Sequence, residues 1–116
     1  MERIPVSKPM LGKKEKEYIT KALEKGEISG TFGEYISRFE EGFSSYVECE
    51  YGVATTNGTS ALHLALASCG IEKGDEVLVS SLTNMASFFS VLYTGAVPIP
   101  IDIEPDTWNI NPECIE

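Results

Sequence analysis

The stretch VATTNGTSALHLALASCG, residues 53–70, constrains the fold of this chain more than any other segment. A short β-branched run gives way to Asn57, Gly58, Thr59 and Ser60, and an apolar helical pattern follows up to Gly70. The pattern predicts a strand over YGVATT, residues 51–56, and then a helix over residues 59–69. Such a junction has two interpretations. Thr59 or Ser60 simply caps the helix, or the turn binds an anion.

The same alternation continues along the chain. GDEVLVSS, residues 74–81, predicts a strand, NMASFFSVLYTG, residues 84–95, a helix, and AVPIPIDI, residues 96–103, another strand. The prolines of the last strand suit a sheet edge or a strand end. Strands separated by single helices imply right-handed crossovers and a parallel sheet, so the predicted fold class is α/β.

The first third of the chain has a different character. Residues 1–12, with two prolines and a glycine, predict an extended arm, and residues 13–26 predict an amphipathic helix that stops at Gly26. A glycine-rich loop follows, and a second amphipathic helix starts at Glu34. We therefore expect an arm, helix and loop over residues 1–33 and a larger domain over residues 34–116. Near the end, Asn111, Pro112 and Glu113 are typical of a helix start.

Charge and composition exclude several classes of function. The net charge is -9, from 18 acidic and 9 basic residues, which disfavours nucleic-acid binding. The three cysteines and His63 show no metal-ligand spacing, so we expect no metal site. No apolar run is long enough to span a bilayer, and the start lacks the apolar core of a signal peptide. We expect a cytoplasmic protein with no membrane partner.

The start of the predicted helix has features that suit an anion. A helix N-terminus leaves about four backbone N–H groups without partners and carries roughly half a positive charge. Gly58 permits a ligand to approach the backbone, and Thr59 and Ser60 add two hydroxyls. Neither common nucleotide-binding glycine motif is present, so the residues alone leave the cap and the anion site as alternatives.

Longer segments carry a family resemblance. NGTSALHLAL, residues 57–66, and YTGAVPIPIDIEPDTWNINP, residues 93–112, are its most specific parts. Over essentially its whole length the chain resembles the DegT/DnrJ/StrS-type pyridoxal-phosphate-dependent sugar aminotransferases. The resemblance implies the N-terminal part of a fold type I large domain, mainly a parallel sheet with crossover helices, incomplete in this chain. In that fold the first strand is not adjacent to the next two, because later strands lie between them.

The resemblance also implies roles for individual residues. Gly58, Thr59 and Ser60 would hold the phosphate of pyridoxal 5'-phosphate. Asn84 falls where the family usually has an aromatic ring that stacks on the cofactor, and its amide would lie over that ring or bond a substrate hydroxyl. Thr83 would cap the helix that follows. Two further residues in the glycine-rich loop, near the expected active-site entrance, are substrate-contact candidates: Ser29 and Gly30.

No residue of this chain is expected to be catalytic. The Schiff-base lysine of the family is expected beyond Glu116, and Lys73 reads as a surface turn residue. The resemblance implies an intact homodimeric enzyme that moves an amino group from glutamate or glutamine to a keto group of a nucleotide-linked deoxysugar. Two alternatives stay open. The first is a sugar dehydratase of the same family. The second is a non-catalytic truncated remnant or interaction fragment, inactive by itself.

Overall fold

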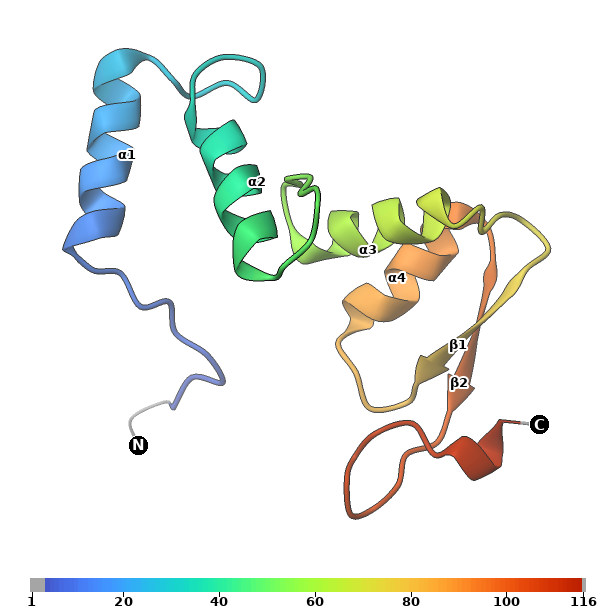
Figure 1. Ribbon diagram of the computed structural model, residues 1–116. Coiled ribbons are helices and arrows are strands. Elements are labelled where there is room, and N and C mark those ends of the chain that lie inside the picture. Colours follow the sequence, from blue (N-terminus) through green and yellow to red (C-terminus); the bar gives the residue numbers. More distant parts are fainter. Residues whose placement is uncertain (1–3, 116) are drawn as a thin grey trace. The chain divides into compact units, whose positions relative to one another are not determined.

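The computed structural model describes residues 4–115, which form two compact units (Figure 1). The N-terminal unit ends at Ala54, and the C-terminal unit begins at Thr55. This division does not coincide with the expected boundary between residues 33 and 34, so a cofactor domain over residues 34–116 stays a prediction. Among the described residues, no helix combines the length and the apolar character needed to cross a bilayer.

The N-terminal unit contains α1, Lys13–Lys25, and α2, Tyr35–Tyr46. At the end of α1, Gly26 adopts a φ of 70°, in the left-handed region, and its N–H donates to the carbonyl of Leu23 at 3.1 Å. Glycine enters this region without a Cβ penalty and thereby satisfies the last carbonyls of the helix. The predicted helix stop at Gly26 is confirmed.

Aromatic and charged side chains connect α1 with α2. The rings of Tyr18 and Tyr35 meet edge to face with centroids 6.1 Å apart, and the Arg38 guanidinium lies 5.9 Å from each ring centroid. Lys25 Nζ donates to Glu34 Oε1 at 3.0 Å, and this hydrogen bond lowers the pKa of the Glu34 carboxyl. These groups are solvent-exposed, so the ion pair adds little to stability.

The segment expected as a first strand, residues 51–56, is not a strand. It has no strand partner among residues 4–115, because the only sheet in that range pairs two later segments. The middle of the segment contacts α2 instead, where the N–H of Ala54 donates to Glu40 Oε1 at 2.8 Å. A Cβ on Gly52 would lie 2.7 Å from the main-chain oxygen of Glu40, so this close approach requires glycine.

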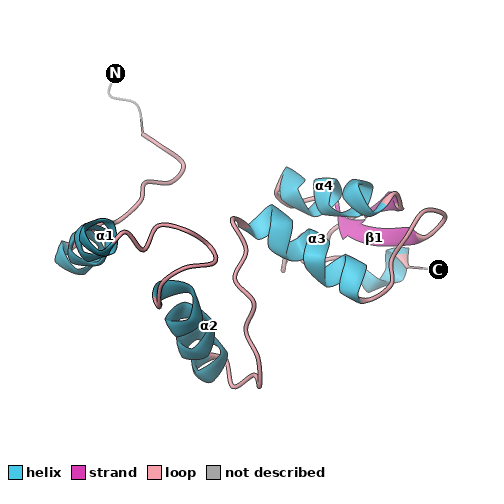
Figure 2. Ribbon diagram, turned by 90° about the horizontal axis from the view of Figure 1, so that it is seen from above, coloured by secondary structure: helices cyan, strands magenta, loops and turns pink. Residues whose placement is uncertain are grey.

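The C-terminal unit alternates helices and strands as the sequence predicts. Its elements are α3 (Gly58–Ser68), β1 (Glu76–Ser80), α4 (Met85–Thr94) and β2 (Val97–Ile101). β1 and β2 pair in parallel, with a register from Glu76 opposite Val97 to Ser80 opposite Ile101. α4 is the crossover that parallel pairing requires, and Figure 2 shows it beside α3. The predicted α/β class and parallel pairing are confirmed.

The prolines of β2 fall where the strand tolerates them. The N–H of Val97 donates to the carbonyl of Asp75 at 2.9 Å, so the odd-numbered residues of β2 face β1. Pro98 and Pro100 therefore place their missing N–H groups on the edge that turns away from β1. This arrangement agrees with the edge position predicted from the prolines.

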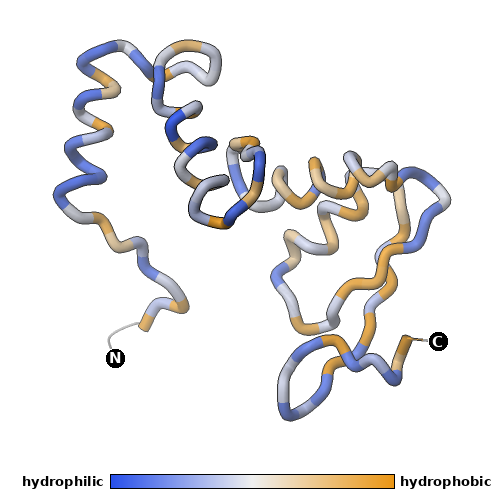
Figure 3. The backbone as a smooth tube through the Cα atoms, in the orientation of Figure 1, coloured by the Kyte–Doolittle hydropathy of each residue, from blue (hydrophilic) through white to orange (hydrophobic). Residues whose placement is uncertain are grey.

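A small apolar core holds the C-terminal unit together. The buried residues Val79, Val91 and Ala96 form its centre, with partly buried Leu66, Ile71, Val77 and Phe88 packed against them. Apolar residues accordingly concentrate in the strands and in α3 and α4 (Figure 3). His63 packs edge-on against the ring of Tyr93, with centroids 5.7 Å apart, which fixes the two helices against each other.

The chain after β2 closes a tight loop. Ile103 and Ile110 form an antiparallel bridge, and the N–H of Asn111 donates to the carbonyl of Asp102 at 2.9 Å. Asn111 then accepts the N–H of Glu113 at 3.0 Å, and a 3-10 turn, η1, spans Pro112–Cys114. The predicted cap is confirmed, but within the described residues the expected helix reaches only this turn.

The N-cap of α4 is Asn84, and the expectation that Thr83 caps this helix is wrong. Asn84 has the extended backbone of an N-cap residue, with a ψ of 142°, and its Oδ1 accepts the N–H of Ala86 at 2.9 Å. Thr83 lies one position too early, and its hydroxyl pairs with that of Ser87 at 3.0 Å.

Two glycines of the N-terminal unit should respond oppositely to alanine. Gly52→Ala forces a Cβ to within 2.7 Å of a backbone oxygen and should destabilise the protein by about 1–3 kcal/mol. Gly42 lies inside α2 with open space around it, so Gly42→Ala should stabilise by about 0.5–1 kcal/mol. Urea unfolding followed by circular dichroism measures both changes. Equal effects of the two variants would contradict the close approach at Gly52.

The cap at Asn84 should be replaceable by another capping side chain. Asn84→Ala removes the acceptor of the Ala86 N–H and should cost about 1 kcal/mol, whereas Asn84→Ser retains an oxygen acceptor and most of the stability. Thermal melting of both variants checks this expectation. Equal losses in the two variants would mean that the capping bond is not the stabilising contact.

Candidate functional site

The start of α3 presents unpaired hydrogen-bond donors. Asn57 is its N-cap, and its Oδ1 accepts the N–H of Ser60 at 2.9 Å, while the N–H of Ala61 donates to the Asn57 carbonyl at 3.1 Å. The preceding two N–H groups, those of Gly58 and Thr59, have no acceptor in the described part of the chain. Neither Thr59 nor Ser60 caps the helix. The N-cap is Asn57.

Space and hydroxyl groups accompany these donors. A Cβ built on Gly58 would meet no atom within 4 Å, so the backbone is open to an approaching group. The Thr59 hydroxyl makes no hydrogen bond within residues 4–115, and the Ser60 hydroxyl lies 3.5 Å from that of Thr56. Two amide donors, two hydroxyls and open space fit an oxyanion such as a phosphate monoester.

The C-terminal unit is acidic as a whole, but the first turn of α3 carries no acidic side chain. Residues 55–116 carry eight acidic residues and one basic residue, Lys73, which gives a net charge of 1 - 8 = -7. No acidic residue lies in the first turn of α3 or of α4. The positive end of each helix dipole is therefore not neutralised by its own first turn.

A second set of polar groups follows the carboxyl end of β1. In the sequence, α3 precedes β1 and α4 follows it. Figure 1 shows that both helices begin on the side toward which the β1 arrow points. Asn84 lies here, with its Oδ1 engaged in the cap and its side-chain NH2 free of partners among the described residues. In open α/β sheets, ligands bind outside the carboxyl ends of strands, which is where this loop lies.

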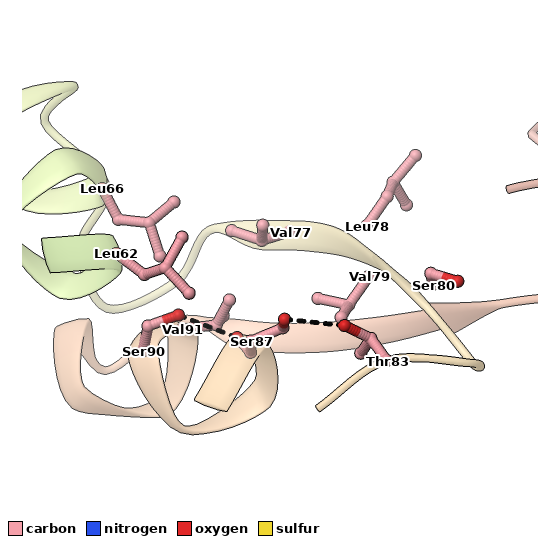
Figure 4. A pocket seen from close by; sticks show the side chains of 10 residues that line it. All are labelled: Leu62, Leu66, Val77, Leu78, Val79, Ser80, Thr83, Ser87, Ser90 and Val91. Atoms are coloured by element: carbon pink, nitrogen blue, oxygen red, sulfur yellow. Dashed lines mark hydrogen bonds between the residues drawn. The ribbon is translucent and has the colours of Figure 1, made fainter. Parts of the chain in front are cut away.

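A cavity of about 280 Å³ lies between β1, α3 and α4 (Figure 4). Its wall is mainly apolar, and the hydroxyls of Thr83, Ser87 and Ser90 line one side. Ser90 is buried and donates to the carbonyl of Ser87 at 2.8 Å, so its polar atom is already satisfied.

The predicted substrate-contact residues belong to the N-terminal unit. Ser29 and Phe32 form an isolated bridge around Gly30, and the hydroxyls of Ser29 and Thr31 lie 3.1 Å apart. Ser29 and Gly30 thus share a tight exposed turn, and their role stays a prediction.

Two other polar residues considered as candidates, Asp102 and Lys73, lie in loops of the C-terminal unit. Asp102 Oδ1 accepts the N–H of Ile103 at 2.8 Å, in the loop after β2. Lys73 is exposed in the turn that precedes β1, as expected. Within residues 4–115 no three His, Cys, Asp or Glu side chains are grouped as metal ligands.

The predicted helix start after Asn57 is confirmed, but the capping role of Asn57 was not predicted. The signal was available, because asparagine directly before a helical pattern is a preferred N-cap. The capping role was predicted for Thr59 or Ser60 because of their hydroxyls, and this prediction is wrong.

Comparison with known proteins identifies the family of this chain. The model of the DegT/DnrJ/EryC1/StrS aminotransferase family matches residues 9–116. The chain is 45% identical over 116 residues to GDP-perosamine synthase of Escherichia coli O157:H7, covering 100% of this chain and 32% of that protein. It is 41% identical over 116 residues to GDP-perosamine synthase of Caulobacter vibrioides, covering 100% of this chain and 31% of that protein.

A solved structure agrees in fold. The aminotransferase from Psychrobacter cryohalolentis superposes with a TM-score of 0.86 and 35% sequence identity, over 96% of this chain and 28% of that one. The chain thus spans about a third of the length of the curated relatives it matches. On the family match over residues 9–116, this chain belongs to the DegT/DnrJ/EryC1/StrS aminotransferase family.

Proposed function

We propose that the intact protein is a pyridoxal-phosphate-dependent sugar aminotransferase and that this chain supplies part of its cofactor site. Family membership supports the reaction class. The observation that carries the proposal for this chain is the pair of unpaired N–H groups at Gly58 and Thr59, beside open space and the hydroxyls of Thr59 and Ser60. A phosphate monoester is the cofactor group that matches these donors.

Four groups at the start of α3 would hold the cofactor phosphate. The Gly58 and Thr59 N–H groups would donate to its oxygens, and the Thr59 and Ser60 hydroxyls would donate from the same turn. The open space over Gly58 allows the close approach that main-chain hydrogen bonds need. The helix dipole adds attraction for the negative charge, and hydrogen bonds to a charged group contribute about 1.5–3 kcal/mol each.

The residues of this chain bind and orient, and none is assigned a proton-transfer step. When bound, pyridoxal 5'-phosphate supplies the aldehyde that accepts the amino group and the ring that withdraws electrons. The lysine that attaches the cofactor is expected outside residues 1–116. Asn84, in the loop after β1, would face the cofactor ring or a substrate hydroxyl with its free NH2.

The family and the relatives' names support the proposed substrates. The amino donor is an amino acid, glutamate or glutamine, and the acceptor is a keto group on a nucleotide-linked deoxysugar. The name GDP-perosamine synthase, carried by both relatives described above, supports a nucleotide-linked amino sugar as product. Ser29 and Gly30 would contact this substrate. A homodimer in the cytoplasm completes the proposal.

Removing the Thr59 hydroxyl should weaken cofactor binding selectively. Thr59→Ala should raise the Kd for pyridoxal 5'-phosphate about 10- to 100-fold, the equivalent of one hydrogen bond to a charged group. Ser68→Ala is the matched control, because it removes a hydroxyl from the opposite end of α3, where it donates to the Leu64 carbonyl at 2.7 Å.

Absorbance titration of the intact protein with the cofactor, together with thermal melting of each variant, measures the effect. Unchanged affinity in Thr59→Ala, or no pyridoxal-type absorbance band in the wild type, would contradict the proposal.

A further inference from the structure

We infer that Asn57 is a positioning residue of the phosphate site and that the neutrality of its amide is required for anion binding. The inference rests on the proposed function, because it concerns the same cofactor phosphate. Asn57 holds the turn that presents the donors to the ligand. Because its side chain is uncharged, it does not repel a bound anion.

The contacts of Asn57 fix the turn on several sides. Its Oδ1 accepts the Ser60 N–H at 2.9 Å, and its carbonyl accepts the Ala61 N–H at 3.1 Å and the Thr55 hydroxyl at 3.0 Å. Its side-chain NH2 donates to Thr56 Oγ1 at 3.4 Å. The residue is exposed, so these bonds rather than burial hold its side chain in place.

This arrangement determines which donors remain for a ligand. The Ser60 N–H is occupied by Asn57, which leaves those of Gly58 and Thr59. Asn57 Oδ1 lies in the same helix turn as the free N–H groups of Gly58 and Thr59. An anion bound by these N–H groups would therefore lie only a few ångströms from Asn57 Oδ1. An aspartate caps a helix as well as an asparagine does, but it would place a full negative charge beside the anion.

The distribution of carboxylates in the chain agrees with this requirement. The C-terminal unit has a net charge of 1 - 8 = -7, yet the caps of α3 and α4 are both asparagines and neither first turn contains an acid. By contrast, the first turns of α1 and η1 contain Glu15 and Glu113. Acidic residues are thus used in helix starts of this chain, but not in those of α3 and α4.

The test compares Asn57→Asp with Asn57→Ser in the intact protein. Both side chains keep an oxygen acceptor for the Ser60 N–H, and only aspartate adds a charge. Each variant is titrated with pyridoxal 5'-phosphate and with pyridoxal, which lacks the phosphate, and its thermal melt is recorded. Asn111→Asp is the matched control, because it makes the same change at the cap of η1, where Oδ1 accepts the Glu113 N–H at 3.0 Å.

We expect Asn57→Asp to bind pyridoxal 5'-phosphate at least about tenfold more weakly than Asn57→Ser, because like charges a few ångströms apart repel. The two variants should bind pyridoxal equally and melt at similar temperatures, and Asn111→Asp should match the wild type.

Equal affinity of the two Asn57 variants for pyridoxal 5'-phosphate would overturn the inference, as would an equal loss for pyridoxal, which would indicate a merely structural role. A wild type that binds no pyridoxal 5'-phosphate would instead overturn the proposed function, and this inference would fall with it.

Discussion

Parallel pairing of β1 with β2 is the constraint on which the C-terminal unit depends. Parallel strands cannot be joined by a hairpin, so the chain must cross back over the sheet, and α4 is that crossover. The crossover places the start of α4 directly after the carboxyl end of β1. The packing of α3 against α4, which His63 and Tyr93 help to fix, then orients the start of α3 toward the same side.

This arrangement leaves backbone hydrogen-bond donors without partners at the start of α3. Helix starts leave N–H groups unpaired, and the fold leaves those of Gly58 and Thr59 open. The C-terminal unit has a single basic residue, so the positive end of the α3 dipole, and not a cluster of basic side chains of this unit, offers attraction for an anion. The one lysine of the C-terminal unit, Lys73, lies in the turn before β1, at the opposite end of the strand.

Sequence reasoning succeeded where the determinants are local. The stop at Gly26 follows from a left-handed glycine, and the alternation of helices and strands in residues 57–101 follows from hydrophobic periodicity. It failed for residues 51–56, because strand formation depends on a partner that is remote in sequence. It also misplaced the α4 cap by one residue, since Thr83 and Asn84 are both acceptable capping residues and only the backbone geometry distinguishes them.

We propose that the two unpaired backbone N–H groups of α3, those of Gly58 and Thr59, bind the cofactor phosphate. A crystal structure of the intact protein with pyridoxal 5'-phosphate tests it most directly. We expect phosphate oxygens within hydrogen-bond distance of the Gly58 and Thr59 nitrogens. A phosphate bound elsewhere, with both nitrogens facing solvent or a protein acceptor, would contradict it.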